Sequence, residues 1–216
     1  MRPRDAATLI LVRRDRGAPE LLMGRRAGGH AFMPGKWVFP GGRLDRCDWH
    51  APVGADLPPE VAAAVGERPA RPRRSPERLA RALALAAVRE TFEETGLILG
   101  RPGDPVRAPG GWERFCGSGY RADLSGLAYV ARAITPPGRP RRFDARFFLC
   151  DASHLAHQEP QDSRELAELA WFPLDDARTL DLPSVTRAVL DLVEQHCSGR
   201  PVTPPFWAIR SRMAAD

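Results

Sequence analysis

Apolar residues along this chain form several short runs and one long helical pattern. Short apolar runs bounded by glycine, proline or charged residues predict β-strands, and the glycine- and proline-containing stretches between them predict loops such as 27–35. The Pro40-Gly41-Gly42 sequence is expected to end the third run in a sharp turn. The predicted strands are 7–12, 20–25, 37–39, 97–99, 127–134, 143–150 and 166–172.

The long pattern predicts a helix over 76–95, begun by the N-cap residue Ser75 and a proline in its first turn. Residues 85, 88 and 92 form an apolar side of this helix, and that side is expected to face the core. Leu79 and Leu83 fall on the opposite side, so another segment or a partner subunit should cover them. Shorter helices are predicted at 59–65, 112–117, 173–177 and 182–196.

The end of the long helix carries three carboxylates in an unfavourable arrangement. Glu90, Glu93 and Glu94 are i, i+3 and i+4 neighbours, and Gly96 is the expected C-cap. Like charges repel at these spacings, and acids are disfavoured at the negative end of the helix dipole. A hard divalent cation such as Mg2+ or Mn2+ would remove both penalties, so the pattern predicts a metal site.

Length and composition indicate a single domain with an insertion. The chain has 216 residues, of which 22 are proline and 19 glycine, and residues 43–75 lose periodicity. We interpret 43–75 as a surface insertion within one domain spanning 1–216, partly packed through a few apolar residues.

Charge and cysteine content limit the classes of partner. The formal net charge of +5 suits an anionic ligand, but no basic helix or aromatic-rich basic patch supports nucleic-acid binding. The four cysteines form no CxxC pair, which argues against a zinc site. No signal peptide or membrane-spanning run is found, so a cytoplasmic protein, possibly a homodimer, is expected.

Two separated motifs resemble a known family. Gly41-Gly42 follows Phe39-Pro40, and the stretch 89–97 reads RETFEETGL. Together they resemble the Nudix box, in which a glycine, five residues, a glutamate and seven residues precede Arg-Glu-apolar-x-Glu-Glu-x-Gly-apolar. The resemblance implies an α/β/α sandwich with a mixed central sheet and a metal-dependent hydrolase that cleaves pyrophosphate bonds.

The spacing departs from the usual box. Arg89 stands 47 positions after Gly42 instead of 14, an excess of 33 residues. Counting back from Arg89, the lone glutamate of the box is replaced by Arg81. Its substitutes could be Glu77, Glu67 or Asp45, and the sequence leaves these open.

A box interrupted in this way resembles the branch that contains the peroxisomal coenzyme A diphosphatase type. The strings MPGKWVFPGGRLD and RRFDARFF support this resemblance. It implies coenzyme A or an acyl derivative as substrate, with a dinucleotide or sugar nucleotide as the alternative. A non-catalytic nucleotide-binding module of the same fold is the competing class, favoured by Arg81.

The resemblance also implies roles for individual residues. The expected metal-binding residues are Glu90, Glu93, Glu94 and Gly41, the last through its carbonyl. Arg89 would orient Glu93, and the catalytic base would be Glu93, Glu159 or Glu165.

Four further residues are candidates for substrate binding. Arg25 and Arg26 stand where related enzymes place a phosphate-binding arginine. The alternative is that both are ordinary solvent-exposed arginines at the end of a strand. Asp144 and Arg146 share a strand face and could line the pocket or form a structural ion pair. Trp37 could stack on a base, but core packing is the commoner role.

Overall fold

The computed structural model describes residues 2–15, 17–28, 33–67, 75–104, 106–156 and 165–208. Within them, eight strands form a mixed central sheet, in which β1 pairs parallel to β9 and antiparallel to β2. Its path is β10-β2-β1-β9-β8-β11, with β3 paired to β2 and β4 to β1. These strands are β1 (Arg4–Arg13), β2 (Glu20–Arg26), β3 (Trp37–Val38), β4 (Gly41–Arg43), β8 (Ala128–Ile134), β9 (Phe143–Asp151), β10 (Leu166–Pro173) and β11 (Phe206–Ala208).

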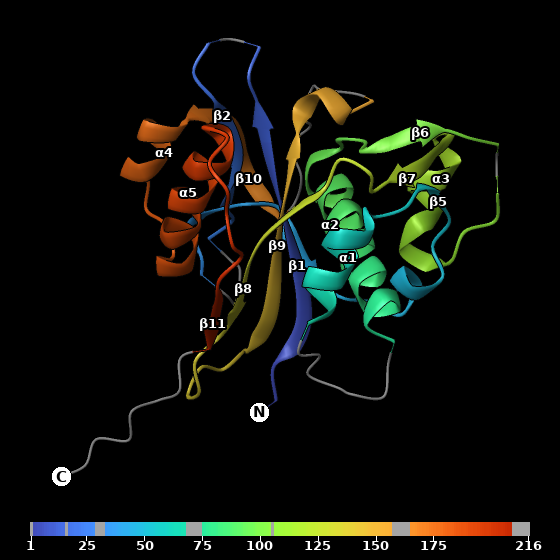
Figure 1. The fold of residues 1–216 in the computed structure, drawn as a ribbon, viewed down its shortest axis with the longest axis horizontal. Helices are drawn as coiled ribbons and strands as arrows, with labels where there is room; N and C mark the ends of the chain where they lie inside the picture. The colour runs from blue at the N-terminus through green and yellow to red at the C-terminus, as the bar shows by residue number, and fades with distance from the viewer. Residues whose placement is uncertain are drawn as a thin grey trace.

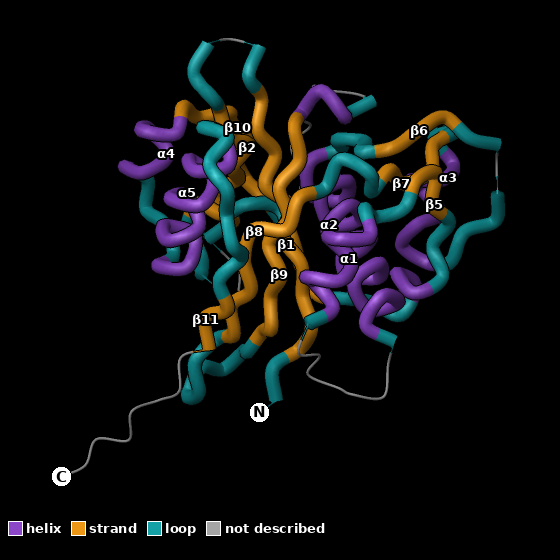
Figure 2. The backbone as a smooth tube through the Cα atoms, viewed as in Figure 1, coloured by secondary structure: helices purple, strands orange, loops and turns teal. Residues whose placement is uncertain are grey.

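Helices cover both faces of this sheet (Figures 1 and 2). Helices α4 (Leu174–Thr179) and α5 (Ser184–Cys197) lie on one face, and α1 (Pro59–Gly66) and α2 (Pro76–Thr95) lie on the other. Beyond α2 lies a second sheet in the order β5-β7-β6. It comprises β5 (Val53–Ala55), β7 (Tyr120–Asp123) and β6 (Gly100–Pro102), next to α3 (Glu113–Gly117). The α/β/α sandwich with a mixed central sheet is therefore confirmed.

The long helix α2 has the predicted bounds because its ends are determined locally. The hydroxyl of Ser75 accepts a hydrogen bond from the backbone N–H of Arg78 at 3.4 Å, and Pro76 occupies the first turn. At the other end Gly96 adopts φ 74°, a left-handed conformation that glycine reaches without steric cost.

The segment 43–75 contributes to the main hydrophobic core as well as to the surface. It contains the 3-10 helix η1 (Cys47–Trp49), β5 and the predicted short helix α1. Leu57 and Val65 from this segment are buried in one cluster with Leu79 and Leu83 of α2. The two leucines that required cover are thus covered within the chain, and the insertion supplies part of that cover.

Some predicted boundaries were wrong. Within the strand expected at 97–99 only Ile98 forms a β-bridge, and the strand β6 begins at Gly100. The sharp turn expected at Gly41-Gly42 is instead strand β4, whose backbone pairs with β1. Strands β7 and β11 were not predicted, since neither carries a strong alternating pattern.

The face of the sheet under α4 and α5 holds a second core cluster. Val189, Leu190 and Val193 of α5 are fully buried there against Phe147 and Leu149 of β9.

Among the helices that the structure describes, none has the length and apolar character needed to span a membrane.

Candidate active site

The glycine strand β4 lies directly against the acidic end of α2. The backbone N–H of Gly41 donates to Glu94 Oε2 at 2.9 Å. A Cβ added at Gly42 would lie 2.4 Å from the carboxyl carbon of Glu90, and one added at Gly41 would lie 2.5 Å from the carbonyl oxygen of Ala7. Glycine at position 41 avoids a clash with the backbone of β1, and glycine at position 42 leaves room for the carboxylate of Glu90, which explains the Gly-Gly pair in the sequence.

Arg89 connects two of the glutamates to the insertion. Its Nη1 lies 2.9 Å from Glu90 Oε1 and 3.0 Å from Glu93 Oε2. Its Nε and Nη2 donate to the two carboxylate oxygens of Asp48 at 2.8 and 3.1 Å. Nη2 also donates to the carbonyl of Arg43 at 3.1 Å. The predicted pairing of Arg89 with Glu93 is present, and the bidentate pair with Asp48 is the stronger restraint on the guanidinium.

Asp48 was not among the carboxylates that sequence analysis proposed. Its side chain is fully buried and also accepts hydrogen bonds from Trp112 Nε1 at 2.9 Å and from the N–H of Asp45 at 2.8 Å. Asp48 stands six positions after Gly42, which is the spacing of the lone glutamate in the Nudix box. Counting forward from the glycine, instead of back from Arg89, would have found it.

None of the three alternatives named from the sequence makes a described hydrogen bond or ion pair with the guanidinium of Arg89. The carboxylate of Glu77 pairs with the hydroxyl of Ser75. Glu67 accepts a hydrogen bond from Arg132 through its backbone carbonyl. The carboxylate of Asp45 accepts from the N–H of Cys47 at 3.2 Å, which lowers the pKa of Asp45.

Burial gives the glutamates unusually high proton affinity. It raises the pKa of Glu94 to about 8 and that of Glu90 to about 7, and the neighbouring carboxylates contribute to both shifts. Burial also raises the pKa of the less buried Glu93. For Arg89, burial alone would lower the pKa, but hydrogen bonds and charge from Asp48 and the glutamates raise it.

The chemistry of this donor set suits a hard divalent cation, which takes carboxylate oxygens as ligands. In this structure, however, no three His, Cys, Asp or Glu side chains of the described residues converge on one point. The reason is visible in the contacts: Arg89 holds oxygens of Glu90 and Glu93, while Gly41 holds an oxygen of Glu94. A cation would bind the carboxylate oxygens that these contacts leave free.

Strand β10 and the end of β2 bring further charges to the glutamates. The charge of Glu165 raises the pKa of Glu94, and the charge of Arg26 lowers it, so both lie within electrostatic range. Arg25 pairs instead with Glu168 at 2.5 Å, as expected because successive strand residues point to opposite faces. The third candidate base, Glu159, lies outside the described residues.

Asp144 and Arg146 pair with each other at 3.0 Å within a buried ion network. Asp144 accepts two hydrogen bonds from Arg132 at 2.8 and 2.7 Å, and Arg146 pairs with Asp5 at 3.0 Å. Both candidate residues are at most 1% exposed. Their surroundings favour the structural ion pair over substrate contact.

Trp37 packs edge-to-face on Phe172 with ring centroids 5.0 Å apart. It belongs to the core under α4 and α5. Trp37 therefore has the commoner role of core packing instead of an exposed position for stacking on a base.

The fold and the site together define a class of protein, namely an α/β/α sandwich in which a glycine strand faces the acidic end of a helix. A solved Nudix hydrolase from Alicyclobacillus acidocaldarius is 32% identical, with a TM-score of 0.67, over 94% of this chain and 99% of its own. The chain belongs to the Nudix hydrolase family.

Two other comparisons place the chain more broadly. The acyl-coenzyme A diphosphatase NUDT19 of Gallus gallus is 28% identical over 78% of this chain, which spans 60% of that relative's length. The Nudix domain of Shewanella oneidensis NrtR, solved with ADP ribose, has a TM-score of 0.53 at 12% identity over 91% of this chain and 90% of its own. This last likeness is one of fold alone. No family model matches the chain.

Proposed function

We propose that this protein is a metal-dependent pyrophosphohydrolase that cleaves a nucleoside diphosphate linked to another moiety, with coenzyme A or an acyl-coenzyme A as the favoured substrate. The observation that carries the proposal is the contact of the glycine strand β4 with Glu90 and Glu94 beside the Arg89 ion pairs. The likeness to the chicken acyl-coenzyme A diphosphatase supports the choice of substrate.

In the proposed reaction, water attacks one phosphorus, the bridging P–O bond breaks, and two phosphate monoesters leave. A cation held by Glu90, Glu93, Glu94 and the Gly41 carbonyl would supply charge neutralisation at the pyrophosphate. Arg89 restrains the rotamers of Glu90 and Glu93 through its ion pairs.

The base that accepts the proton from the attacking water is proposed to be Glu93 or Glu165. Glu93 has a 39% exposed side chain, and Glu165 is exposed, so both can reach solvent. Arg26 is proposed to bind a substrate phosphate, because its charge acts on Glu94.

The contact of Asp48 with Arg89 supports an enzyme over a non-catalytic binding module. Arg81 was the feature that favoured the module, since it stood where a carboxylate was expected. Because Asp48 provides a carboxylate at the Nudix spacing, we infer that the additional residues lie between Asp48 and Arg89.

A substrate panel tests the proposal. Acyl-coenzyme A, coenzyme A, a dinucleotide and a sugar nucleotide are incubated with the protein plus Mg2+, Mn2+ or EDTA, and the two monoester products are quantified. Turnover of the coenzyme A substrates that requires the metal is expected. Preferential turnover of the dinucleotide or sugar nucleotide would support the alternative substrate, and tight binding without turnover of any substrate would support the binding module.

Variants then test the site. Glu93→Gln and Glu94→Gln should each lower the rate by at least about a hundredfold. Glu113→Gln, which alters an exposed acid on α3, is the matched control and should leave the rate unchanged. Unchanged rates in both site variants would refute the assignment of the metal-binding residues.

A further inference from the structure

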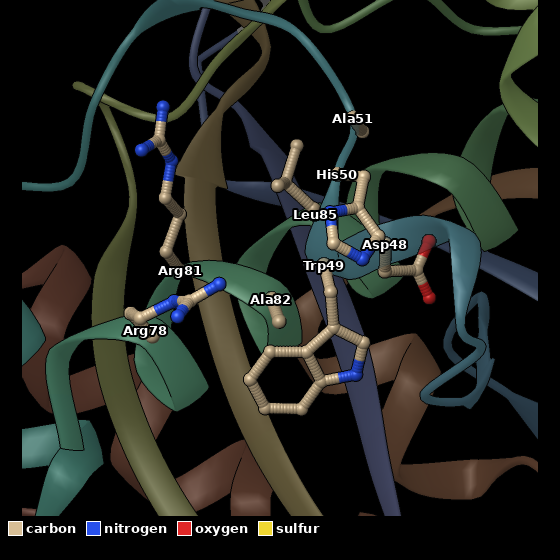
Figure 3. A pocket seen from close by; sticks show the side chains of 8 residues that line it. All are labelled: Asp48, Trp49, His50, Ala51, Arg78, Arg81, Ala82 and Leu85. Carbon is tan, nitrogen blue, oxygen red and sulfur yellow. The ribbon is translucent and has the colours of Figure 1, made fainter. Parts of the chain in front are cut away.

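A separate pocket lies between the insertion and the first turns of α2 (Figure 3). Its volume is about 270 Å³. Trp49 and His50 line it from the insertion, and Arg78 and Arg81 line it from α2. Sites for drug-sized ligands usually span roughly 300–1,000 Å³. This pocket is therefore large enough for a small anion or one nucleotide fragment, but not for a whole dinucleotide.

The two arginines place two positive charges close together near the start of α2. Arg78 is the third residue of the helix, in the first turn at the positive end of the helix dipole, and Arg81 is the sixth residue, one turn further on. Their i, i+3 spacing adds mutual repulsion. An anion between them would relieve both penalties, just as a cation would relieve those of the glutamates at the other end of the same helix.

The described residues compensate these charges only in part. The guanidinium of Arg78 makes no described hydrogen bond or ion pair. Arg81 has one partner, Asp56, at 3.5 Å, and both of these side chains are about half exposed. A loose, solvated pair of this kind contributes little to stability, so Arg81 can turn toward a ligand at small cost.

Asp48 also lines the pocket but does not neutralise it. Its carboxylate accepts hydrogen bonds from Arg89 Nε and Nη2, from Trp112 Nε1, from the N–H of Asp45 and, at 3.8 Å, from Cys47 Sγ. These five bonds use the acceptor capacity of the two oxygens. The pocket therefore presents two arginines, the imidazole of His50 as a potential hydrogen-bond donor, and the indole of Trp49 as an apolar wall.

We infer that this pocket is a phosphate-binding site distinct from the glutamate site, which takes a phosphate or phosphomonoester dianion between Arg78 and Arg81. Arginine binds phosphate in a bidentate manner, and the indole of Trp49 can stack on an attached base. Arg81 lies nine residues before Glu90, which corresponds to about 13 Å along the helix axis.

Calorimetric titration of the metal-free protein with inorganic phosphate and with AMP, at constant ionic strength, tests the inference. Wild type is compared with Arg78→Gln/Arg81→Gln and with the control Arg139→Gln/Arg141→Gln. The control removes the same charge from an exposed loop. Loss of a charge-assisted hydrogen bond corresponds to at least about tenfold in affinity. We expect that loss in the pocket variant and no change in the control.

The choice of ligand distinguishes the source of the phosphate. Tighter binding of AMP than of phosphate, reduced by Trp49→Ala, would assign the pocket to a nucleotide. Equal affinities would assign it to phosphate alone. Equal binding by wild type and the pocket variant, or no binding to wild type, would overturn the inference whether or not the protein hydrolyses pyrophosphates. Circular dichroism of each variant verifies that it is folded.

Discussion

Removing the carboxylate of Asp48 should strongly destabilise the protein. Asp48 is fully buried, and its partner Arg89 has a side chain that is 6% exposed. The substitution Asp48→Ala deletes two hydrogen bonds to a guanidinium, each worth about 1.5–3 kcal/mol, and three bonds to neutral donors, of which the one from Cys47 Sγ is long. It also leaves the charge of Arg89 buried with less compensation. Breaking a buried ion pair from one side costs about 3–5 kcal/mol, and we expect a loss in that range.

Urea unfolding in EDTA, followed by circular dichroism, measures this loss. The control Asp191→Ala removes an acid that is 62% exposed and pairs with Arg178, so its effect should stay below about 1 kcal/mol. A double-mutant cycle of Asp48→Asn with Arg89→Met should give a coupling free energy of at least about 1.5 kcal/mol. A coupling below about 0.5 kcal/mol, or equal losses for Asp48→Ala and Asp191→Ala, would refute the reasoning.

Three further outcomes follow from the same geometry. Gly42→Ala should displace the carboxylate of Glu90 and lower the hydrolysis rate by at least about tenfold. The control Gly117→Ala should leave the rate unchanged, because no atom lies within 4 Å of the added Cβ. Equal rates for the two variants would contradict the steric argument. Because the pKa of Glu94 rises from 4.5 to about 8 on folding, its contribution to metal-free stability is full below pH 4.5 and is lost as the pH rises toward 8. The melting temperature of Glu94→Gln relative to wild type should therefore rise over that range, and a constant difference would contradict the shift. Burial raises the pKa of Cys47 to about 11. In the folded protein at pH 8 its thiol should therefore react with iodoacetamide at least about tenfold more slowly than in the protein unfolded in urea, as measured by peptide mapping. Equal rates in the two states would exclude that shift.

Local signals determined what the sequence could predict. Helix α2 was predicted with the bounds that the structure gives, because the Ser75-Pro76 start and the Gly96 end act within one turn of the helix. The three glutamates and the facing glycines were likewise identified from short motifs. Strand β11 is only three residues long, and its pairing with β8 depends on a distant segment, so no local pattern predicted it.

Asp48 shows the limit of local reasoning within the candidate site. Its partner Arg89 is 41 positions away, so only the tertiary fold brings the two together. The burial of Asp144 and Arg146 was equally inaccessible, because an RFD string has the same alternation whether its face lines a pocket or lies beneath a helix. In both cases the decisive information is which element covers the side chain.

The contacts of Asp48 also explain how the box can accommodate 33 additional residues. The chain from Gly42 to Asp48 stays at the acidic end of α2, where the N–H of Asp45, the indole of Trp112 and the guanidinium of Arg89 all bind the Asp48 carboxylate. The excess of 33 residues is therefore counted between Asp48 and Arg89, after the segment from Gly42 to Asp48. Leu57 and Val65, which precede α2, pack in one cluster with Leu79 and Leu83 of its first turns. Changes in the insertion beyond Trp49 should therefore act on the pocket at Arg78 and Arg81 before they act on the glutamates.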